Sequence, residues 1–268
     1  MDTAPQAGTY LVTIYYTNPP NYLPSSTNLT IIVSKALCSL SITVNGTPEV
    51  FHEITIISQM KPIIVNAQLN IVITGSASPI SGTMYVNASG IGTYIFMPKL
   101  PGNYSVTVSW PGNINYQGGC KATYVLSIMK APLTLNVNGS SNLIAAGGYE
   151  TFNVGITTNI PVNYVSGNLT IIIKSGNRTV SIYELPITGY YVKGSIQFTK
   201  PGIYEVLIEY PGNDYVSPSM YGPYYITVIP GLLGIPWYML LAYLAPIILG
   251  VSIGIVINRR LHQAWQRA

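Results

Sequence analysis

Few side chains in this sequence could carry out catalysis. Only one histidine, His52, precedes the last ten residues, and a Ser-His-acid arrangement would have to combine it with Glu49 or Glu53. The surrounding segment VFHEITII alternates as a β-strand does, which places Glu53 on the face opposite His52. We therefore expect His52 to be a structural residue of a strand and not a catalytic base.

Carboxylates are also scarce. Paired carboxylates for glycoside hydrolysis, or a cluster for calcium, would have to be drawn from Asp2, Glu49, Glu53, Glu150, Glu184, Glu205, Glu209 and Asp214. Glu205 and Glu209 fall on the outward face of one alternating strand, where we expect a solvated sheet edge. No glycine-rich phosphate-binding loop precedes a helical segment. The sequence thus predicts no catalytic, cofactor-binding or metal-binding residues, and no enzyme activity.

The chain contains two cysteines, Cys38 and Cys120. Both fall within one predicted domain, residues 37–131, which suits a disulfide formed in an oxidising compartment. The alternative is a pair of buried free thiols.

Seven Asn-x-Ser/Thr sequons precede the apolar C-terminal segment and none follows it: Asn28, Asn45, Asn87, Asn103, Asn138, Asn168 and Asn177. Such sequons are glycosylation acceptors in exported proteins, which favours an extracellular glycoprotein. A sequence rich in Asn and Thr also forms sequons by chance, and the segment after the apolar stretch is short.

Composition excludes several classes of protein. Of 268 residues, 48% are hydrophobic and only 7% are charged, far fewer charges than in an ordinary cytosolic enzyme. Three of the twelve basic residues, Arg259, Arg260 and Arg267, lie in the last ten positions. The remainder carries nine basic and eight acidic residues, so it has no basic patch for nucleic acid. We expect no nucleic-acid partner.

The segment GLLGIPWYMLLAYLAPIILGVSIGIVI predicts a transmembrane helix over residues 231–258, and hence the lipid bilayer as a partner. Its last 23 residues would extend roughly 34 Å as a helix, enough to cross the hydrocarbon core. The tail, residues 259–268, is basic through Arg259 and Arg260 and contains no acid. The positive-inside rule therefore predicts a single-pass protein of the cell membrane with a cytoplasmic C-terminus and an extracellular N-terminal portion.

Other residues of this segment suggest how the helix would sit. Trp237 and Tyr238 would lie at the outer interface, the usual place for amphipathic rings. Gly250 and Gly254 form a GxxxG pair through which two helices could self-associate. Small residues are common in membrane spans for other reasons too, so both explanations stay open.

Internal repeats predict the rest of the architecture. Three segments can be aligned: QAGTYLVTIYYTNPPNY, LPGNYSVTVSWPGNINY and KPGIYEVLIEYPGNDY. Each contains Gly-x-Tyr, with Tyr10, Tyr104 and Tyr204, and then alternates with period two. A turn and a second alternating strand follow, so each copy is predicted to be a β-hairpin with one buried face.

The spacing of these hairpins predicts an all-β fold, with tandem Ig-like β-sandwiches followed by a single C-terminal transmembrane α-helix. The repeats are 95 and 100 residues apart, the size of one sandwich. We predict sandwiches over 37–131 and 132–230, and a partial Ig-like domain, its last hairpin only, over 1–36. Either Met1 is not the true start and the chain continues upstream, or this hairpin packs as a cap on the first full domain.

The hairpin LPGNYSVTVSWPGNINY and its copies are similar to the last strands of bacterial and archaeal Ig-like repeat families of surface proteins. Those strands read Pro-x-Gly-x-Tyr/His, alternating aliphatics, Tyr-x-Gly-Asp/Asn, a Tyr and a final strand. The match covers residues 6–230 and is specific in the hairpins. It implies a sandwich used as a spacer, stalk or adhesive module. Tyr104, with Tyr10 and Tyr204, looks like a structural tyrosine corner.

The overall composition also resembles surface-layer and adhesin-like proteins of thermophilic archaea. We therefore expect a membrane-anchored extracellular structural or adhesive protein, with surface-layer proteins, other cell-surface proteins or glycans as partners. Two other functions fit the same pattern. The chain could be the anchor stalk of a larger secreted enzyme, or a membrane glycoprotein of an archaeal virus.

Overall fold

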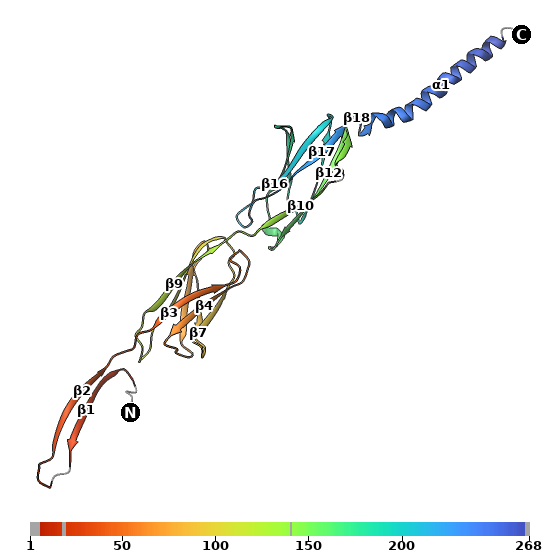
Figure 1. Cartoon of the computed structure of the whole chain (residues 1–268). Coiled ribbons are helices and arrows are strands. Elements are labelled where there is room, and N and C mark those ends of the chain that lie inside the picture. Colours follow the sequence, from red (N-terminus) through yellow and green to blue (C-terminus); the bar gives the residue numbers. More distant parts are fainter. Residues whose placement is uncertain (1–5, 18–19, 140, 266–268) are drawn as a thin grey trace. The chain divides into compact units, whose positions relative to one another are not determined.

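The computed structural model describes residues 6–17, 20–139 and 141–265, with side chains up to residue 260. Its strands and its C-terminal helix are drawn in Figure 1. The chain divides into two compact units, Met1–Lys130 and Ala131–Ala268.

The first unit contains a β-sandwich of two antiparallel sheets. One sheet has the order β3-β4-β7, formed by Ser39–Asn45, Ile54–Lys61 and Ile91–Phe96. The other has the order β6-β5-β8-β9, formed by Ile80–Tyr85, Gln68–Thr74, Gly102–Trp110 and Cys120–Ile128. This arrangement of three strands facing four is that of an Ig-like sandwich.

Period-two alternation places one face of each strand in the core of this sandwich. Ile54 and Ile56 of β4 are fully buried, as are Val106 and Val108 of β8. The ring of Phe96 on β7 packs edge-on against the ring of Tyr104 on β8, with ring centroids 5.4 Å apart. This contact joins the two sheets. Burial of these alternating aliphatic faces is what stabilises the sandwich.

The second unit repeats the sandwich with a wider second sheet. The smaller sheet has the order β10-β12-β15, formed by Leu133–Gly139, Gly148–Thr158 and Tyr191–Phe198. The larger has the order β11-β17-β16-β13-β14, formed by Leu143–Ala145, Ser219–Ile229, Gly202–Tyr210, Asn168–Ser175 and Arg178–Pro186. A short 3-10 helix, η1, spans Val162–Tyr164. The predicted fold class is confirmed: tandem Ig-like sandwiches followed by one C-terminal apolar helix.

The N-terminal repeat forms a hairpin of β1 (Gly8–Tyr16) and β2 (Ser25–Val33). Among the described strands, these two pair only with each other. Val12 and Ile14 are 37% and 55% exposed, whereas the matching Val106 and Val108 of β8 are 0% exposed. In this hairpin, the face that is buried in the full sandwiches is exposed.

The C-terminal helix α1 spans Trp237–Trp265. The segment before it, predicted as the start of the membrane helix, instead forms a small hairpin of β18 (Gly231–Leu232) and β19 (Ile235–Pro236). Leu233 and Gly234 turn the chain with φ of 50° and 81°, which no helix accommodates. The predicted helix start at residue 231 is therefore wrong. The helix also continues past residue 258 into the predicted tail, whose last residues, 266–268, lie outside the described residues.

Candidate functional site

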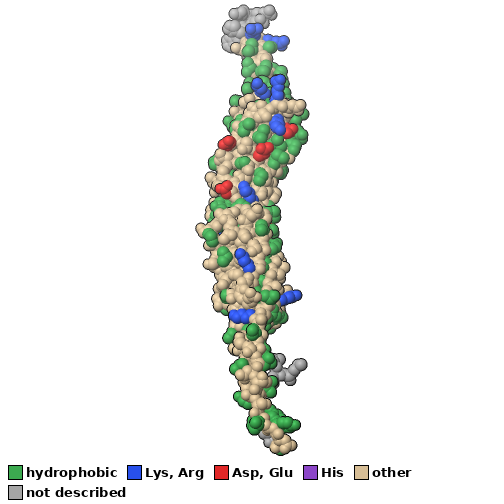
Figure 2. All heavy atoms as spheres, turned by 90° about the vertical axis from the view of Figure 1, so that its left-hand side faces the viewer, with side chains coloured by type: hydrophobic (Ala, Val, Ile, Leu, Met, Phe, Trp, Pro, Cys, Tyr) green, Lys and Arg blue, Asp and Glu red, His purple; other side chains and the backbone are tan. Residues whose placement is uncertain are grey.

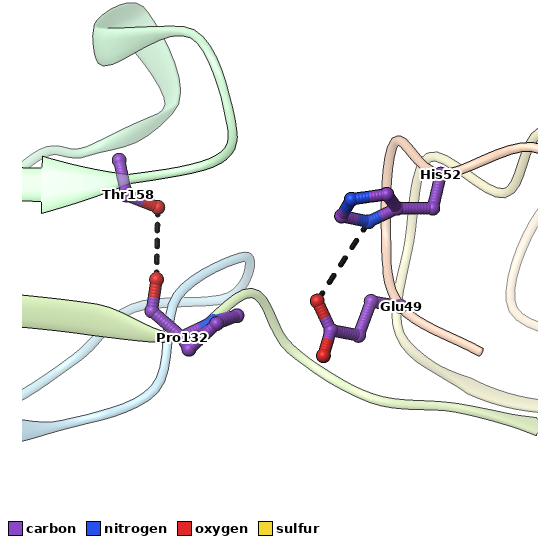
Figure 3. Close-up of polar contacts among 4 residues, drawn as sticks. All are labelled: Glu49, His52, Pro132 and Thr158. Carbon is purple, nitrogen blue, oxygen red and sulfur yellow. Dashed lines mark hydrogen bonds and ion pairs between the residues drawn. The ribbon is translucent and has the colours of Figure 1, made fainter. Parts of the chain in front are cut away.

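The histidine considered for catalysis lies in a turn, so its predicted place in a strand is wrong. Residues 50–52 turn the chain, with a φ of 61° at Phe51, and β4 begins only at Ile54. The turn is closed by the His52 N–H, which donates to the Glu49 carbonyl at 3.4 Å. As Figure 3 shows, this brings His52 Nδ1 to 3.7 Å from Glu49 Oε2. Glu53 is exposed.

The predicted solvated edge at Glu205 and Glu209 is also wrong. Their strand, β16, lies inside its sheet, between β17 and β13. Both side chains are half-buried on the outer face, and Glu205 Oε1 lies 3.9 Å from Lys174 Nζ on β13. The expected side-chain direction was right, but neighbouring strands flank the carboxylates on both sides.

The three predicted tyrosine corners have one geometry. The hydroxyl of each tyrosine donates to the carbonyl four residues earlier: Tyr10 to Gln6 at 2.7 Å, Tyr104 to Leu100 at 2.8 Å, and Tyr204 to Lys200 at 2.9 Å. Burial raises the pKa of Tyr104, and the hydrogen bond to Leu100 offsets part of that rise. These groups close loops, which is a structural role.

The turn that follows the repeated strand forms the same hydrogen bonds in each unit. In the first unit, Asn113 Oδ1 accepts from the N–H groups of Asn115 and Tyr116, and in the second, Asn213 Oδ1 accepts from Tyr215 and Val216. Each of these turns also accepts a hydrogen bond from a residue shortly before the first strand of its sandwich. Ala36 N donates to Asn115 O at 2.9 Å, and Ala131 N donates to Tyr215 O at 2.8 Å.

A further bond fixes the start of the second sandwich. Thr158 Oγ1 donates to Pro132 O at 2.9 Å, as drawn in Figure 3. Because Pro132 has no N–H to donate, its carbonyl is the backbone group through which it can form a hydrogen bond. The bond therefore ties the carbonyl of this residue to the end of β12.

The structure joins Cys38 and Cys120 in a disulfide with a Cα–Cα distance of 5.9 Å. Cys38 immediately precedes β3 and Cys120 begins β9, so the bond links the two sheets of the first sandwich.

All seven sequon asparagines are exposed: Asn28, Asn45, Asn87, Asn103, Asn138, Asn168 and Asn177. Two of them hold local structure. Asn87 Oδ1 accepts from the N–H groups of Ser89 and Ile91, and Asn168 Nδ2 donates to Glu184 Oε2 at 2.9 Å. Ser140, the third residue of the Asn138 sequon, lies outside the described residues. Exposure makes the asparagines accessible to glycosylation.

The burial of one carboxylate, Glu150, was not predicted from the sequence. Glu150 is 0% exposed, and its two oxygens accept from Ser141 N at 3.1 and 3.2 Å. It lies in the wall of a cavity of about 180 Å³ in the second sandwich. The alternation of Phe152, Val154 and Ile156, continued two residues upstream, would have placed Glu150 on the inward face.

The helix α1 carries the residues predicted to form the membrane anchor. The stretch Trp237–Arg260 has a mean hydropathy of 2.5 over its most apolar window, and none of that window is buried. By length and composition it could cross a membrane. Trp237 and Tyr238 are exposed at its start, and Arg259 and Arg260 are exposed toward its other end.

Charged side chains are sparse on the surface. On the face shown in Figure 2, they are scattered among hydrophobic and uncharged polar groups. Within the described ranges, no group of three or more His, Cys, Asp or Glu residues is placed to hold a metal ion.

A scan against protein-family models and a search of curated proteins gave no match. Among solved structures, a tetra-tandem repeat from the extending region of a large adhesion protein is 13% identical, with a TM-score of 0.41, over 81% of this chain and 56% of that chain. Invasin, a bacterial integrin-binding protein, is also 13% identical, with a TM-score of 0.40, over 72% of this chain and 40% of that chain. A two-domain fibronectin type-III segment of chicken tenascin is 10% identical, with a TM-score of 0.38, over 70% of this chain and 97% of that chain.

This chain thus spans little more than half of the adhesion-protein repeat and less than half of invasin. At such identities and TM-scores the similarity does not extend to a partner or an activity.

Proposed function

We propose that this chain is a membrane-anchored extracellular protein in which the Ig-like sandwiches act as a spacer and adhesive module, without catalysis. The observation that carries this proposal is the exposed apolar helix Trp237–Arg260. A helix that presents apolar side chains all round is either buried in protein or placed in a bilayer. None of its most apolar window is covered by protein here.

The dimensions and flanks of the helix support an anchor. Its 24 residues extend roughly 36 Å, at about 1.5 Å per residue, slightly more than a hydrocarbon core of about 30 Å. Arg259 and Arg260 mark the end that stays in the cytoplasm, and Trp237 and Tyr238 mark the outer interface. The proposed orientation places both sandwiches outside the cell.

The properties of the sandwiches suit that location. Their sequon asparagines are exposed, and a disulfide such as Cys38–Cys120 persists in oxidising surroundings. The proposed partners are other cell-surface proteins, including surface-layer proteins, or glycans. Added Cβ atoms at Gly250 and Gly254 would meet nothing within 4 Å, so a second copy of the helix could approach there.

Alkaline extraction of membranes tests the anchor. Cells would produce the full chain with an epitope tag after Ala268, a variant lacking residues 237–260, and a control lacking the hairpin residues 8–33. We expect the full chain and the hairpin deletion to stay in the membrane pellet and the helix deletion to be released. Release of the full chain would contradict an anchor.

Protease added to intact cells tests the orientation. We expect digestion of the sandwiches while the tagged C-terminal fragment survives. Loss of the tag with the sandwiches protected would reverse the proposed topology.

A further inference from the structure

The second sandwich contains a cavity of about 520 Å³ between the edge strands of its two sheets. β14 lies at the edge of the larger sheet and β15 at the edge of the smaller one. Both strands contribute to the wall, which includes Val180, Ser181, Tyr183, Ser195, Ile196 and Gln197. Most of these side chains are exposed, so the cavity opens to solvent.

The strand β15 has a counterpart in the first sandwich. There, Phe96 of β7 packs edge-on against the corner tyrosine Tyr104. In the second sandwich, Phe198 of β15 packs edge-on against the corner tyrosine Tyr204, with ring centroids 5.1 Å apart. β15 therefore corresponds to β7, and the two phenylalanines occupy the same position.

A tyrosine ring closes the corresponding space in the first sandwich. Tyr94, two residues before Phe96, lies on β7, and its ring contacts Gly82 of β6. A Cβ added at Gly82 would lie only 2.6 Å from Tyr94 Cε2. The residue two positions before Phe198 is Ile196, which is buried. The ring that β7 places between the two edge strands is therefore missing from β15.

The opposite wall of the cavity has a tyrosine where the first sandwich has the glycine. Gly82 pairs with Ile71 of β5, and Tyr183 pairs with Ile171 of β13. Each isoleucine is buried and pairs with the residue four positions after the corner tyrosine of its unit. Because paired residues share a face, Tyr183 is directed toward the smaller sheet. Its side chain is 39% exposed, so it borders the space without filling it.

The wall suits an aromatic ring that bears a hydroxyl group. The exposed rings of Tyr149 and Tyr183 offer partners for aromatic packing, and the hydroxyls of Ser181 and Ser195 can form hydrogen bonds. Among the lining residues, Lys200 is the only charged one, so a neutral occupant brings no unpaired charge. Cavities of about 150 Å³ hold benzene, which leaves room here for a ring and the backbone that carries it.

The free edge of β15 favours an occupant with a polypeptide backbone. Among the described strands, β15 pairs only with β12. Its other edge borders the cavity, where backbone N–H and C=O groups remain available for pairing. An extended segment can add to such an edge as a further strand, with alternate side chains directed toward the core.

The geometry points to a docking site for a tyrosine side chain presented by an extended segment of a partner protein. The segment would pair with the free edge of β15, and its ring would take the place that Tyr94 fills in the first sandwich. The inference rests on the proposed adhesion to other cell-surface proteins and not on the membrane anchor. Binding is measured on the full chain in a zwitterionic detergent, so failure of the anchor would leave the result intact.

The probe is N-acetyl-L-tyrosinamide, titrated by saturation-transfer NMR with the detergent alone as a blank. We expect a Kd on the order of 1–10 mM, as befits so small a ligand, and at least tenfold weaker binding of N-acetyl-L-alaninamide. Ile196→Tyr supplies a ring from β15 itself and should weaken binding at least tenfold. The control Ile182→Tyr adds the same ring on the outer face of β14, where Ile182 is 60% exposed, and should leave binding unchanged.

A double variant, Ile196→Tyr with Tyr183→Gly, copies the pair of Tyr94 and Gly82. It should lose binding to the same extent, and it decides the matter if circular dichroism shows that Ile196→Tyr alone fails to fold. Equal binding of N-acetyl-L-alaninamide, or equal binding by the wild type and the folded cavity variants, overturns the site. Binding of methyl β-D-glucoside without binding of the probe overturns the assignment to tyrosine. Self-association of the full chain that Ile196→Tyr abolishes would make a second copy the occupant and overturn the assignment to another protein.

Discussion

At the scale of the residue, the hydroxyls of the corner tyrosines close loops by donating hydrogen bonds to backbone carbonyls. Tyr104 bonds to Leu100 and Tyr204 to Lys200, and the ring of each packs edge-on against a phenylalanine of the facing sheet, at 5.4 and 5.1 Å. One side chain therefore closes a loop and joins two sheets. Gly75 shows how closely the ring of Tyr104 is packed, because an added Cβ would lie 2.7 Å from Tyr104 Cδ1.

Tyr104→Phe removes the hydroxyl that donates to the Leu100 carbonyl and keeps the ring. We expect the first sandwich to lose about 1 kcal/mol of unfolding free energy, the usual net value of one hydrogen bond. Tyr85→Phe, an exposed tyrosine of the same unit, is the control and should change stability by less than about 0.5 kcal/mol. Denaturant unfolding measures the unfolding free energy of both variants. Equal stability of the two variants would mean that the hydrogen bond from Tyr104 to Leu100 adds nothing to the unfolding free energy.

Not every important residue could be predicted from the sequence. The tyrosine corners could be found, because Gly-x-Tyr recurs before an alternating strand. The closeness of Gly75 to Tyr104 could not, since it depends on how distant segments meet. The cavity beside Glu150 likewise depends on Gly139 and Tyr224 arriving from separate strands.

At the scale of the element, alternation predicts strands that have one buried face and misses the others. The repeated hairpins β8–β9 and β16–β17 were predicted because their apolar residues alternate. The edge strands β6 and β14 were missed, since most of their residues are exposed on both faces. The sequence around His52 was interpreted as a strand, but the chain turns there. The residue with positive φ in this turn is Phe51, and phenylalanine is not a residue type that indicates a turn.

The disulfide is the element-scale feature with the largest expected effect on stability. It closes a loop with a sequence separation of 82 residues. Cys38→Ser combined with Cys120→Ser should lower the unfolding free energy of the first sandwich by about 2–5 kcal/mol.

The second sandwich contains no cysteine and serves as an internal control in the same sample. Denaturant unfolding with and without reductant checks the prediction. If reductant shifts the second transition as strongly as the first, the effect does not come from the disulfide.

At the scale of the whole molecule, sparse charge determines the response to pH. The chain contains only eight Asp and Glu residues, so few protonations can be linked to unfolding in acid. Tyrosines act on the alkaline side. Burial raises the pKa values of Tyr104, Tyr210 and Tyr224 above the ordinary value of 10.0.

The sign of the alkaline effect follows from these raised values. Above about pH 10 the unfolded chain loses these tyrosine protons first, so unfolding releases protons and stability falls as pH rises. We expect the unfolding midpoint temperature to change little from pH 7 to pH 4 and to fall from pH 9 to pH 11. Calorimetry measures both. If the midpoint temperature instead fell sharply at pH 4 and stayed level at pH 11, carboxylates and not tyrosines would be the groups linked to unfolding.

The scattered charges of the surface also bear on the salinity that the protein can tolerate. Ion pairs at a surface weaken in brine, where the Debye length falls to about 3 Å at 1 M salt. Here the pair Lys174–Glu205, at 3.9 Å, is a minor part of what holds the second sandwich together. Aliphatic burial is not screened by ions, so the same sandwiches should hold their shape in fresh water and in brine.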